Sequence, residues 1–258
     1  MLIFSAITPH PPIIIPEIGS EGDLRQVKGT MDAMKQLSGE LKKEDPDTII
    51  IVSPHALLHP EAFGINESDS LKGDMSQFGF EKKFLFDNDL ELVEKIKKEA
   101  TEKDLQINSF QEKLDHGALV PLYFLTEGIQ PKIIHLAFSL QSREKHYQLG
   151  EIIRKICGDT NEKIAFIASG DLSHRLSPFA PAGYSPQGKI FDDQLIEHLE
   201  KADVDGVINM NNQLIEDAGE CGYRSILILL GMVGKDFHFD KKSYEGPFGV
   251  GYLAARTS

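Results

Sequence analysis

Short, uninterrupted apolar runs are the feature that most limits the folds open to this 258-residue sequence. Residues 48–52, 132–138 and 163–169 are rich in Ile, Ala, Val and Leu and lack regular polar alternation. Strands of this kind are buried on both faces, which is typical of parallel sheets. A similar run at 2–8 is separated from the next by an amphipathic helix over 23–43. We therefore predict an α/β fold, with a central, largely parallel or mixed sheet covered by helices on both faces.

The rest of the chain continues this alternation of elements. Apolar spacing predicts further helices at 90–103, 118–125, 142–157, 186–217 and 226–230, and strands at 62–65, 235–244 and 248–255. The run at 118–125 has a length that fits a helix or a strand, and we favour a buried helix. Residues 59–84 contain much Gly, Ser and Asp, and we expect a long loop around the short strand. No repeat or linker divides the sequence, so we expect a single domain over residues 1–258.

The charge of the chain limits the classes of partner that it can bind, and its cysteine content indicates its cellular location. The formal net charge is −13 and no basic cluster is present, which argues against nucleic acid and anionic membranes as partners. The apolar runs are far shorter than the roughly 20 residues needed to cross a bilayer. Two cysteines do not make a disulfide framework, so we expect a reducing, cytoplasmic location. A homo-oligomer is also expected.

Histidines follow the carboxyl ends of three predicted strands, at His10, His55 and His174. These ends carry the chemistry of open α/β sheets. If the strands are parallel neighbours, the histidines share one cleft, together with His116, which lies before the apolar run at 118–125. Two imidazoles and one carboxylate form the facial triad of non-haem Fe(II) sites, and Glu220 is the candidate carboxylate.

The segment Gly170-Asp171-Leu172-Ser173-His174 carries a possible proton-transfer group. Asp171 and Ser173 lie close enough in sequence to fix the tautomer of His174, whose ordinary pKa suits proton transfer near neutral pH. A nucleophilic Ser173 is a weaker alternative, because no Gly-x-Ser-x-Gly elbow surrounds it.

A histidine after a strand is, taken singly, more often structural than functional. We interpret four further histidines as structural, and a fifth is a closer case because it lies near His55. The four are His135, His146, His198 and His238, and the fifth is His59.

Five short segments occur in an order that resembles the class III extradiol ring-cleaving dioxygenases, the superfamily of the B subunit of protocatechuate 4,5-dioxygenase. Within it, the chain looks most like the branch found beside or fused to AMMECR-type domains and related to Memo proteins. The segments are Thr8-Pro9-His10-Pro11-Pro12, Ser53-Pro54-His55, Asp115-His116-Gly117, Gly170-Asp171-Leu172-Ser173-His174 and Glu220-Cys221-Gly222-Tyr223-Arg224.

The resemblance implies roles for particular residues. It makes His10 and His55 metal ligands and His174 the acid/base histidine. His116 is implied as a second catalytic residue that lines the substrate pocket, and we place Asp171 on the substrate side as well. The third ligand is either Glu220, as in ring-cleaving members, or Cys221, as in Memo-like members.

The metal and the function depend on that third ligand. A carboxylate favours Fe(II), whereas a thiolate favours a softer metal such as Cu(I) or Zn. The first hypothesis is an Fe(II) extradiol dioxygenase that cleaves a catecholic substrate with dioxygen. The second is a Memo-like metal-binding protein that acts with an AMMECR-type partner and cleaves no ring. The third is a zinc hydrolase that uses the same histidines and a metal-bound water.

Overall fold

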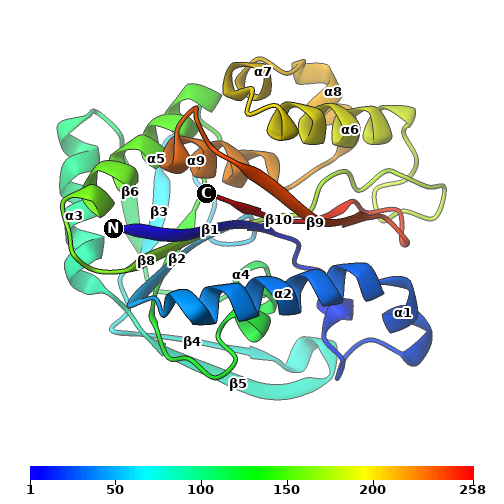
Figure 1. Ribbon diagram of the computed structural model, residues 1–258, viewed down its shortest axis with the longest axis horizontal. Coiled ribbons are helices and arrows are strands. Elements are labelled where there is room, and N and C mark those ends of the chain that lie inside the picture. Colours follow the sequence, from blue (N-terminus) through cyan, green and yellow to red (C-terminus); the bar gives the residue numbers. More distant parts are fainter.

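An eight-stranded sheet lies at the centre of the computed structural model, which describes all 258 residues. The strand order is β6-β3-β7-β2-β8-β1-β10-β9. Figure 1 shows helices above and below this sheet. The strands are β1 (Leu2–Thr8), β2 (Thr48–Ser53), β3 (Phe63–Asn66), β6 (Ile107–Phe110), β7 (Lys132–Ala137), β8 (Ile164–Ser169), β9 (Phe239–Glu245) and β10 (Tyr252–Thr257).

The four central strands, β7, β2, β8 and β1, run parallel to one another. Ile51 of β2 pairs with Ile167 of β8, and Ile7 of β1 pairs with Ala168 of β8, all of them buried. Antiparallel neighbours flank this group, because β3 pairs with β7 and β10 pairs with β1 in opposite directions. The predicted α/β class with a mixed sheet is confirmed.

Two hydrophobic cores lie on the two faces of the sheet. Side chains of α2 and α4 contribute to a core of 27 buried residues, and those of α3, α5, α6 and α9 contribute to one of 42. The helices, including one 3₁₀ turn, are η1 (Pro12–Ile14), α1 (Glu21–Gln26), α2 (Lys28–Glu44), α3 (Leu90–Glu102), α4 (His116–Leu125), α5 (Arg143–Gly158), α6 (Pro186–Glu200), α7 (Val204–Ile208), α8 (Asn212–Ala218) and α9 (Tyr223–Val233).

The prediction of a loop over 59–84 around one short strand was wrong. A hairpin of β4 (Ser70–Met75) and β5 (Phe80–Asp87), joined by the 3₁₀ turn η2 (Ser76–Phe78), occupies much of that segment and forms a separate two-stranded sheet. Polar residues hide it in the sequence, because the exposed positions of a half-buried strand tolerate Lys, Asp and Ser.

The helix predicted over 23–43 is divided into α1 and α2. The side chain of Ser20 caps the first helix by accepting a hydrogen bond from the Asp23 amide. The break falls at Val27, which is fully buried, so the apolar spacing continues across it and gives no sign of an interruption.

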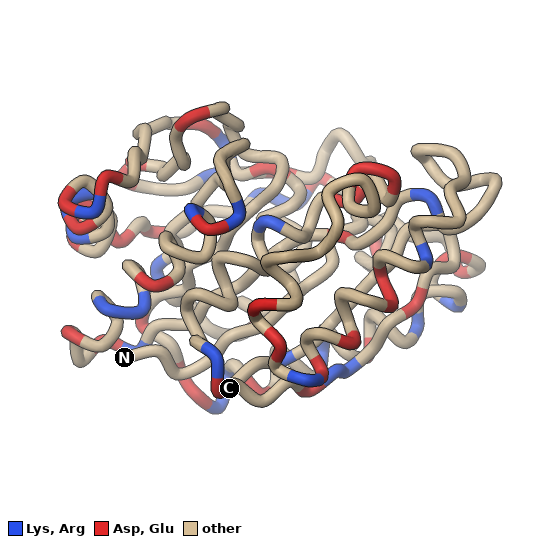
Figure 2. The backbone as a smooth tube through the Cα atoms, turned by 90° about the horizontal axis from the view of Figure 1, so that it is seen from above, with Lys and Arg blue, Asp and Glu red and all other residues tan.

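Charged residues of both signs are distributed along the whole chain. Figure 2 shows Asp and Glu over most helices, with Lys and Arg interspersed among them. No helix combines the length and the apolar composition that crossing a membrane requires.

Candidate metal centre

Three histidines converge at one end of the sheet. His10 follows β1, His55 follows β2, and His116 is the first residue of α4. One ligand nitrogen from each lies within 4.8 Å of the others. His10 Nε2 and His55 Nε2 are 3.0 Å apart, and the ring of His116 stacks on that of His55 with centroids 4.2 Å apart. His10 is buried, whereas His55 is exposed, so the cluster can be reached from solvent.

The hydrogen bonds of Ser169 fix the tautomer of His10. The Ser169 hydroxyl donates to the Gly117 carbonyl at 2.5 Å, so its oxygen is left to accept from His10 Nδ1 at 3.2 Å. His10 Nδ1 therefore carries the proton, and its Nε2 offers a lone pair on the side of His55, whose Nε2 lies 3.0 Å away. Metal-binding histidines are held by hydrogen bonds of this kind at the other ring nitrogen.

Asp115 joins the parts of the protein that carry the other two histidines. Its Oδ1 caps α4 by accepting from the Ala118 amide at 3.2 Å and also accepts from the Ser53 hydroxyl at 2.5 Å. Its Oδ2 lies 3.2 Å from His135 Nε2 in β7. Burial by itself would raise the pKa of Asp115, but His135 and Ser53 outweigh it and hold that pKa well below the ordinary value. An ionised carboxylate thus ties His116 to the end of β2.

The electrostatics of the cluster favour neutral imidazoles. Burial lowers the pKa of His10, with His55 and His116 lowering it further, and burial likewise lowers the pKa of His55 and of His116. Neutral imidazoles offer lone pairs to a metal ion. The sequence prediction grouped these three histidines in one cleft, and the structure brings them together.

The two candidates for the third ligand, Glu220 and Cys221, lie at different distances from the histidine cluster. Cys221 Sγ is 3.8 Å from His10 Nε2. The carboxylate of Glu220 accepts a hydrogen bond from the Tyr223 amide at 2.6 Å, at the start of α9, and lines a separate cavity of about 270 Å³ with Arg224. Burial raises the pKa of Glu220 to about 7 and that of Cys221 well above its ordinary value.

The donor atoms fit a metal ion. A tetrahedral ion with metal–nitrogen bonds of about 2.0 Å and metal–sulfur bonds of about 2.3 Å separates two nitrogens by about 3.3 Å and a nitrogen from a sulfur by about 3.6 Å. The observed separations of 3.0 and 3.8 Å, for His10 with His55 and with Cys221, are close to these values. The three side chains whose ligand atoms all lie within 4.8 Å of one another are His10, His55 and His116, and Cys221 is not among them. Imidazole and thiolate suit Zn and Cu, and imidazole also suits Fe.

His174 lies next to the histidine cluster on the loop after β8. Its Nδ1 donates to the Leu172 carbonyl at 3.0 Å, so the proton is placed on that nitrogen. Burial lowers the pKa of His174, and His55 lowers it further. The neighbouring Asp171 accepts from the His10 amide at 2.9 Å and is buried, which raises its pKa to about 7. Ser173 Oγ donates to the Ala218 carbonyl at 2.9 Å and is not directed at His174.

The remaining histidines lie outside the cluster. His59 accepts from the Glu61 amide, His146 bonds two main-chain carbonyls, His198 pairs with Asp203, and His238 joins Ser258 through the main chain.

The sequence analysis assigned no role to the residues that support the site. Ser53, Asp115 and Ser169 position the histidines, and the ring of Phe78, from the unexpected hairpin, lies 5.6 Å from that of His116. His135, interpreted from the sequence as structural, contacts Asp115. The position of Ser53 and Ser169 as polar residues at the ends of β2 and β8 was the available signal in the sequence. The contact between His135 and Asp115 could not be predicted in this way, because it depends on the order of the strands in the sheet.

The chain is similar to known proteins over nearly its whole length. A family model described as the catalytic LigB subunit of aromatic ring-opening dioxygenase matches residues 5–255. Protein CA_C1420 of Clostridium acetobutylicum is 35% identical over 266 aligned positions, which cover 95% of this chain and 55% of the relative. The chain thus spans about half the length of that clostridial protein.

Other relatives differ in coverage. The 3,4-dihydroxyphenylacetate 2,3-dioxygenase of Escherichia coli is 28% identical, over 92% of this chain and 91% of the relative. The MEMO1 family protein Mbar_A1422 of Methanosarcina barkeri is 25% identical over 49% of this chain and 45% of the relative. The crystal structure of the uncharacterized protein JW3007 from Escherichia coli K12 has a TM-score of 0.72 at 14% identity, covering 98% of this chain and 99% of that one, which shows a shared fold.

Proposed function

Because the chain belongs to the family of the catalytic LigB subunit of aromatic ring-opening dioxygenases, we propose that it binds Fe(II) and opens the ring of a catecholic substrate with dioxygen. The observation that carries this proposal is the convergence of His10 and His55, with Nε2 atoms 3.0 Å apart, beside His116 and His174. The similarity to the Escherichia coli dioxygenase supports it, since it extends over 91% of that protein.

His10 and His55 would hold the metal. Bound there, iron would lower the pKa of the catechol hydroxyls and hold the diol and dioxygen side by side. Ser169 keeps the lone pair of His10 Nε2 directed into the site, and Asp115 keeps His116 against His55. His116 presents a neutral ring beside the metal-binding nitrogens, where a substrate would lie.

His174 would move the proton. Its Nδ1 proton is engaged by the Leu172 carbonyl, so Nε2 would be the nitrogen that accepts a proton from a catechol hydroxyl and returns it. Burial keeps this imidazole neutral at pH 7 and therefore ready to act as a base.

Turnover of catechols by the iron-loaded protein tests the proposal. Protein loaded anaerobically with Fe(II) is mixed with air-saturated buffer and a panel of catechols that begins with 3,4-dihydroxyphenylacetate. We expect the yellow absorbance of a ring-opened product and matching oxygen consumption, and neither for a His10→Ala variant. Stoichiometric iron without turnover of any catechol would refute ring cleavage.

A second candidate, a Memo-like metal-binding protein that acts with an AMMECR-type partner and cleaves no ring, is favoured by one specific observation. Cys221 lies beside His10, whereas Glu220 would have to leave the Tyr223 amide to reach the metal. A thiolate ligand would favour Zn or Cu over iron.

Metal content of two matched variants separates the candidates. Loss of metal from Glu220→Gln, with retention by Cys221→Ser, would support the two-histidine, one-carboxylate set of an iron dioxygenase. Loss from Cys221→Ser alone would support the Memo-like candidate and contradict that carboxylate set. Both variants are checked for folding by circular dichroism before metal analysis.

A further inference from the structure

The tip of the β4–β5 hairpin reaches the metal centre through the side chain of Phe78. This residue is the last of the turn η2 and is half-buried, and its ring centroid lies 5.6 Å from that of His116 at an interplanar angle of 66°. Aromatic rings favour such edge-to-face arrangements. Gly79 follows with a φ of 80°, which lets the chain turn directly after Phe78 and enter β5.

The ring of His116 is held by contacts with other rings and by no hydrogen bond. His10 and His174 each have a hydrogen bond at Nδ1, whereas neither ring nitrogen of His116 has a hydrogen-bond partner in the chain. Its ring stacks on that of His55 with centroids 4.2 Å apart and meets that of His10 at 5.6 Å. Phe78 is the one ring outside the histidine cluster that contacts it. Without Phe78, nothing on that side would stop the imidazole from rotating about its side-chain bonds.

Strand β4 fastens the hairpin to the segment that carries His116. The Lys72 carbonyl accepts from the Leu114 amide at 2.8 Å, two residues before His116. Gly73 lies directly against Leu119 of α4, since a Cβ at Gly73 would be 2.8 Å from the Leu119 side chain. These contacts fix β4, and with it the turn that follows, relative to the first residue of α4.

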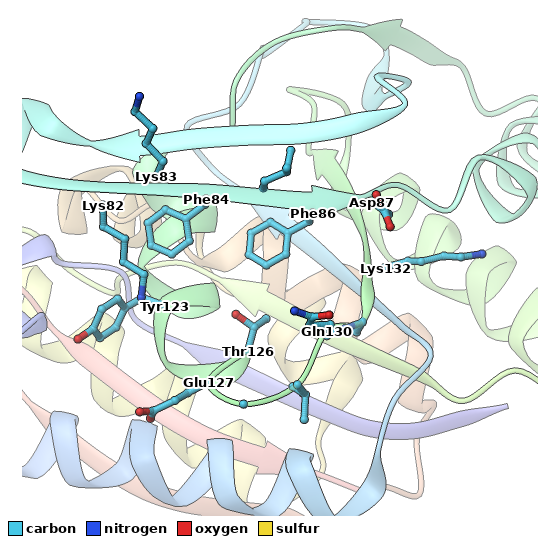
Figure 3. Close-up of a pocket in the computed structure, with 14 residues that line it drawn as sticks. Lys82, Lys83, Phe84, Phe86, Asp87, Tyr123, Thr126, Glu127, Gln130 and Lys132 are labelled. Carbon is cyan, nitrogen blue, oxygen red and sulfur yellow. The ribbon is translucent and has the colours of Figure 1, made fainter.

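The other strand of the hairpin is not continuous with the central sheet. Residues 82–87 of β5 and residues 126–132, which connect α4 to β7, line a cavity of about 600 Å³ (Figure 3). The isolated bridge between Asn88 and Ile133 lies just beyond the end of β5. The position of Phe78 therefore depends on β4 and on the turn rather than on the eight-stranded sheet.

We propose that Phe78 is a positioning residue, which holds the ring of His116 against His55 at the substrate side of the metal centre. The consequence for catalysis rests on the proposed ring-opening function, whereas the position of the ring does not. When the Phe78 ring is removed, the imidazole of His116 rotates away from His55 and no longer lies where the catechol would bind. The hairpin, which forms no part of the central sheet, thus serves to complete the site.

The position of the His116 ring is tested by NMR on the full-length protein, labelled at histidine and kept in chelator so that no paramagnetic iron broadens the signals. A nuclear Overhauser effect is expected between the ring protons of His55 and His116, because their centroids are 4.2 Å apart. It is expected to be lost in Phe78→Ala. The matched control is Phe80→Ala, in the same hairpin, whose ring contacts Tyr123 instead, and it is expected to keep the effect. This measurement needs neither metal nor turnover, so it decides the proposal even if ring cleavage is refuted.

A double-mutant cycle on the iron-loaded protein tests whether Phe78 acts through His116. Phe78→Ala is expected to lower kcat/KM for 3,4-dihydroxyphenylacetate about 3- to 10-fold, the range that one edge-to-face pair supports, without changing the iron content. In a His116→Ala background, the same substitution is expected to change kcat/KM by no more than about twofold, because no imidazole remains to be positioned. Phe78→Tyr keeps the ring and is expected to retain the wild-type kcat/KM.

Circular dichroism checks that each variant is folded. If Phe78→Ala fails to fold, Phe78→Leu, which keeps most of the apolar volume but has no ring, takes its place in both experiments. A nuclear Overhauser effect that is absent from the wild type, or that stays at full strength in Phe78→Ala, would overturn the proposal. Equal falls in kcat/KM in the two backgrounds of the cycle, or an equal fall for Phe80→Ala, would overturn it as well.

Discussion

The buried carboxylate of Asp192 in α6 is expected to impose a measurable pH dependence on the stability of the protein. Asp192 is fully buried. Its Oδ1 accepts from the Ser173 amide at 2.8 Å, and its Oδ2 accepts from the Tyr244 hydroxyl at 2.6 Å. Asp192 thereby holds the loop that carries His174 against α6 and β9. Burial raises the pKa of Asp192 to about 6, from an ordinary value of 3.8.

The direction of this pH dependence follows from the number of protons that the folded and the unfolded protein bind. Between pH 3.8 and about 6, the unfolded chain has lost the Asp192 proton while the folded protein keeps it. Stability from this group is complete below pH 3.8 and is lost as the pH rises through about 6. A shift of about two pKa units corresponds to a loss of about 3 kcal/mol.

The Asp192→Asn variant removes this titration. Its amide can accept from the Ser173 N–H while the Tyr244 hydroxyl rotates to accept from the amide NH₂, so we expect a constant offset of about 1 kcal/mol. The free energy of unfolding of the wild type, minus that of the variant, should therefore fall by about 2.5 kcal/mol between pH 4 and pH 7. Urea unfolding at a series of pH values measures this difference, in which the other carboxylates cancel.

Asp193→Asn is the matched control, because Asp193 is the next residue on α6 and is exposed. The free energy of unfolding of the wild type, minus that of Asp193→Asn, should show no fall of that size over the same pH range. A flat difference for Asp192→Asn, or one that rises with pH, would refute the reasoning that burial dominates at this carboxylate.

Three further changes test other parts of the site. His174→Gln should lower catechol turnover by about 10²- to 10⁴-fold without changing the iron content, and equal loss of iron would contradict a proton-transfer role. Ser169→Ala removes the acceptor that orients His10 and should weaken metal affinity by about 10- to 100-fold in a chelator competition, whereas unchanged affinity would show that the tautomer is fixed otherwise. Gly170→Ala would place a Cβ 2.1 Å from Gly222 Cα and should cost about 1–3 kcal/mol of stability in urea unfolding, while Gly158→Ala, which has open space, should not.

The sequence predicted the parts of the fold that depend on local pattern. The buried strands and most helices were recognisable because their apolar residues follow the period of the element that they form. The β4–β5 hairpin was not, because its strands form a separate sheet and many of their residues are polar and exposed. The break at Val27 was also invisible, since that residue is buried like the helical positions on either side of it.

The choice between Glu220 and Cys221 shows where local pattern fails at the site. Both residues precede α9, so the rotation of about 100° between helical neighbours does not decide their directions. The Tyr223 amide at the start of α9 needs an acceptor, and Glu220 supplies it. That hydrogen bond turns Glu220 toward Arg224 and leaves Cys221 beside His10.

The order of the strands in the sheet brings histidines that are far apart in the sequence close together. β8 lies between β1 and β2, although it follows β2 by more than a hundred residues in the chain. Neighbouring strands are about 4.8 Å apart, so the loops after β1, β8 and β2 begin within roughly 10 Å of one another. Had β1 and β2 been direct neighbours, β8 would adjoin only one of them, and the Gly170–His174 loop would lie to one side of the two histidines. The position of β8 between the strands that precede His10 and His55 thus lets one strand supply both the hydroxyl that orients His10 and the loop that carries His174.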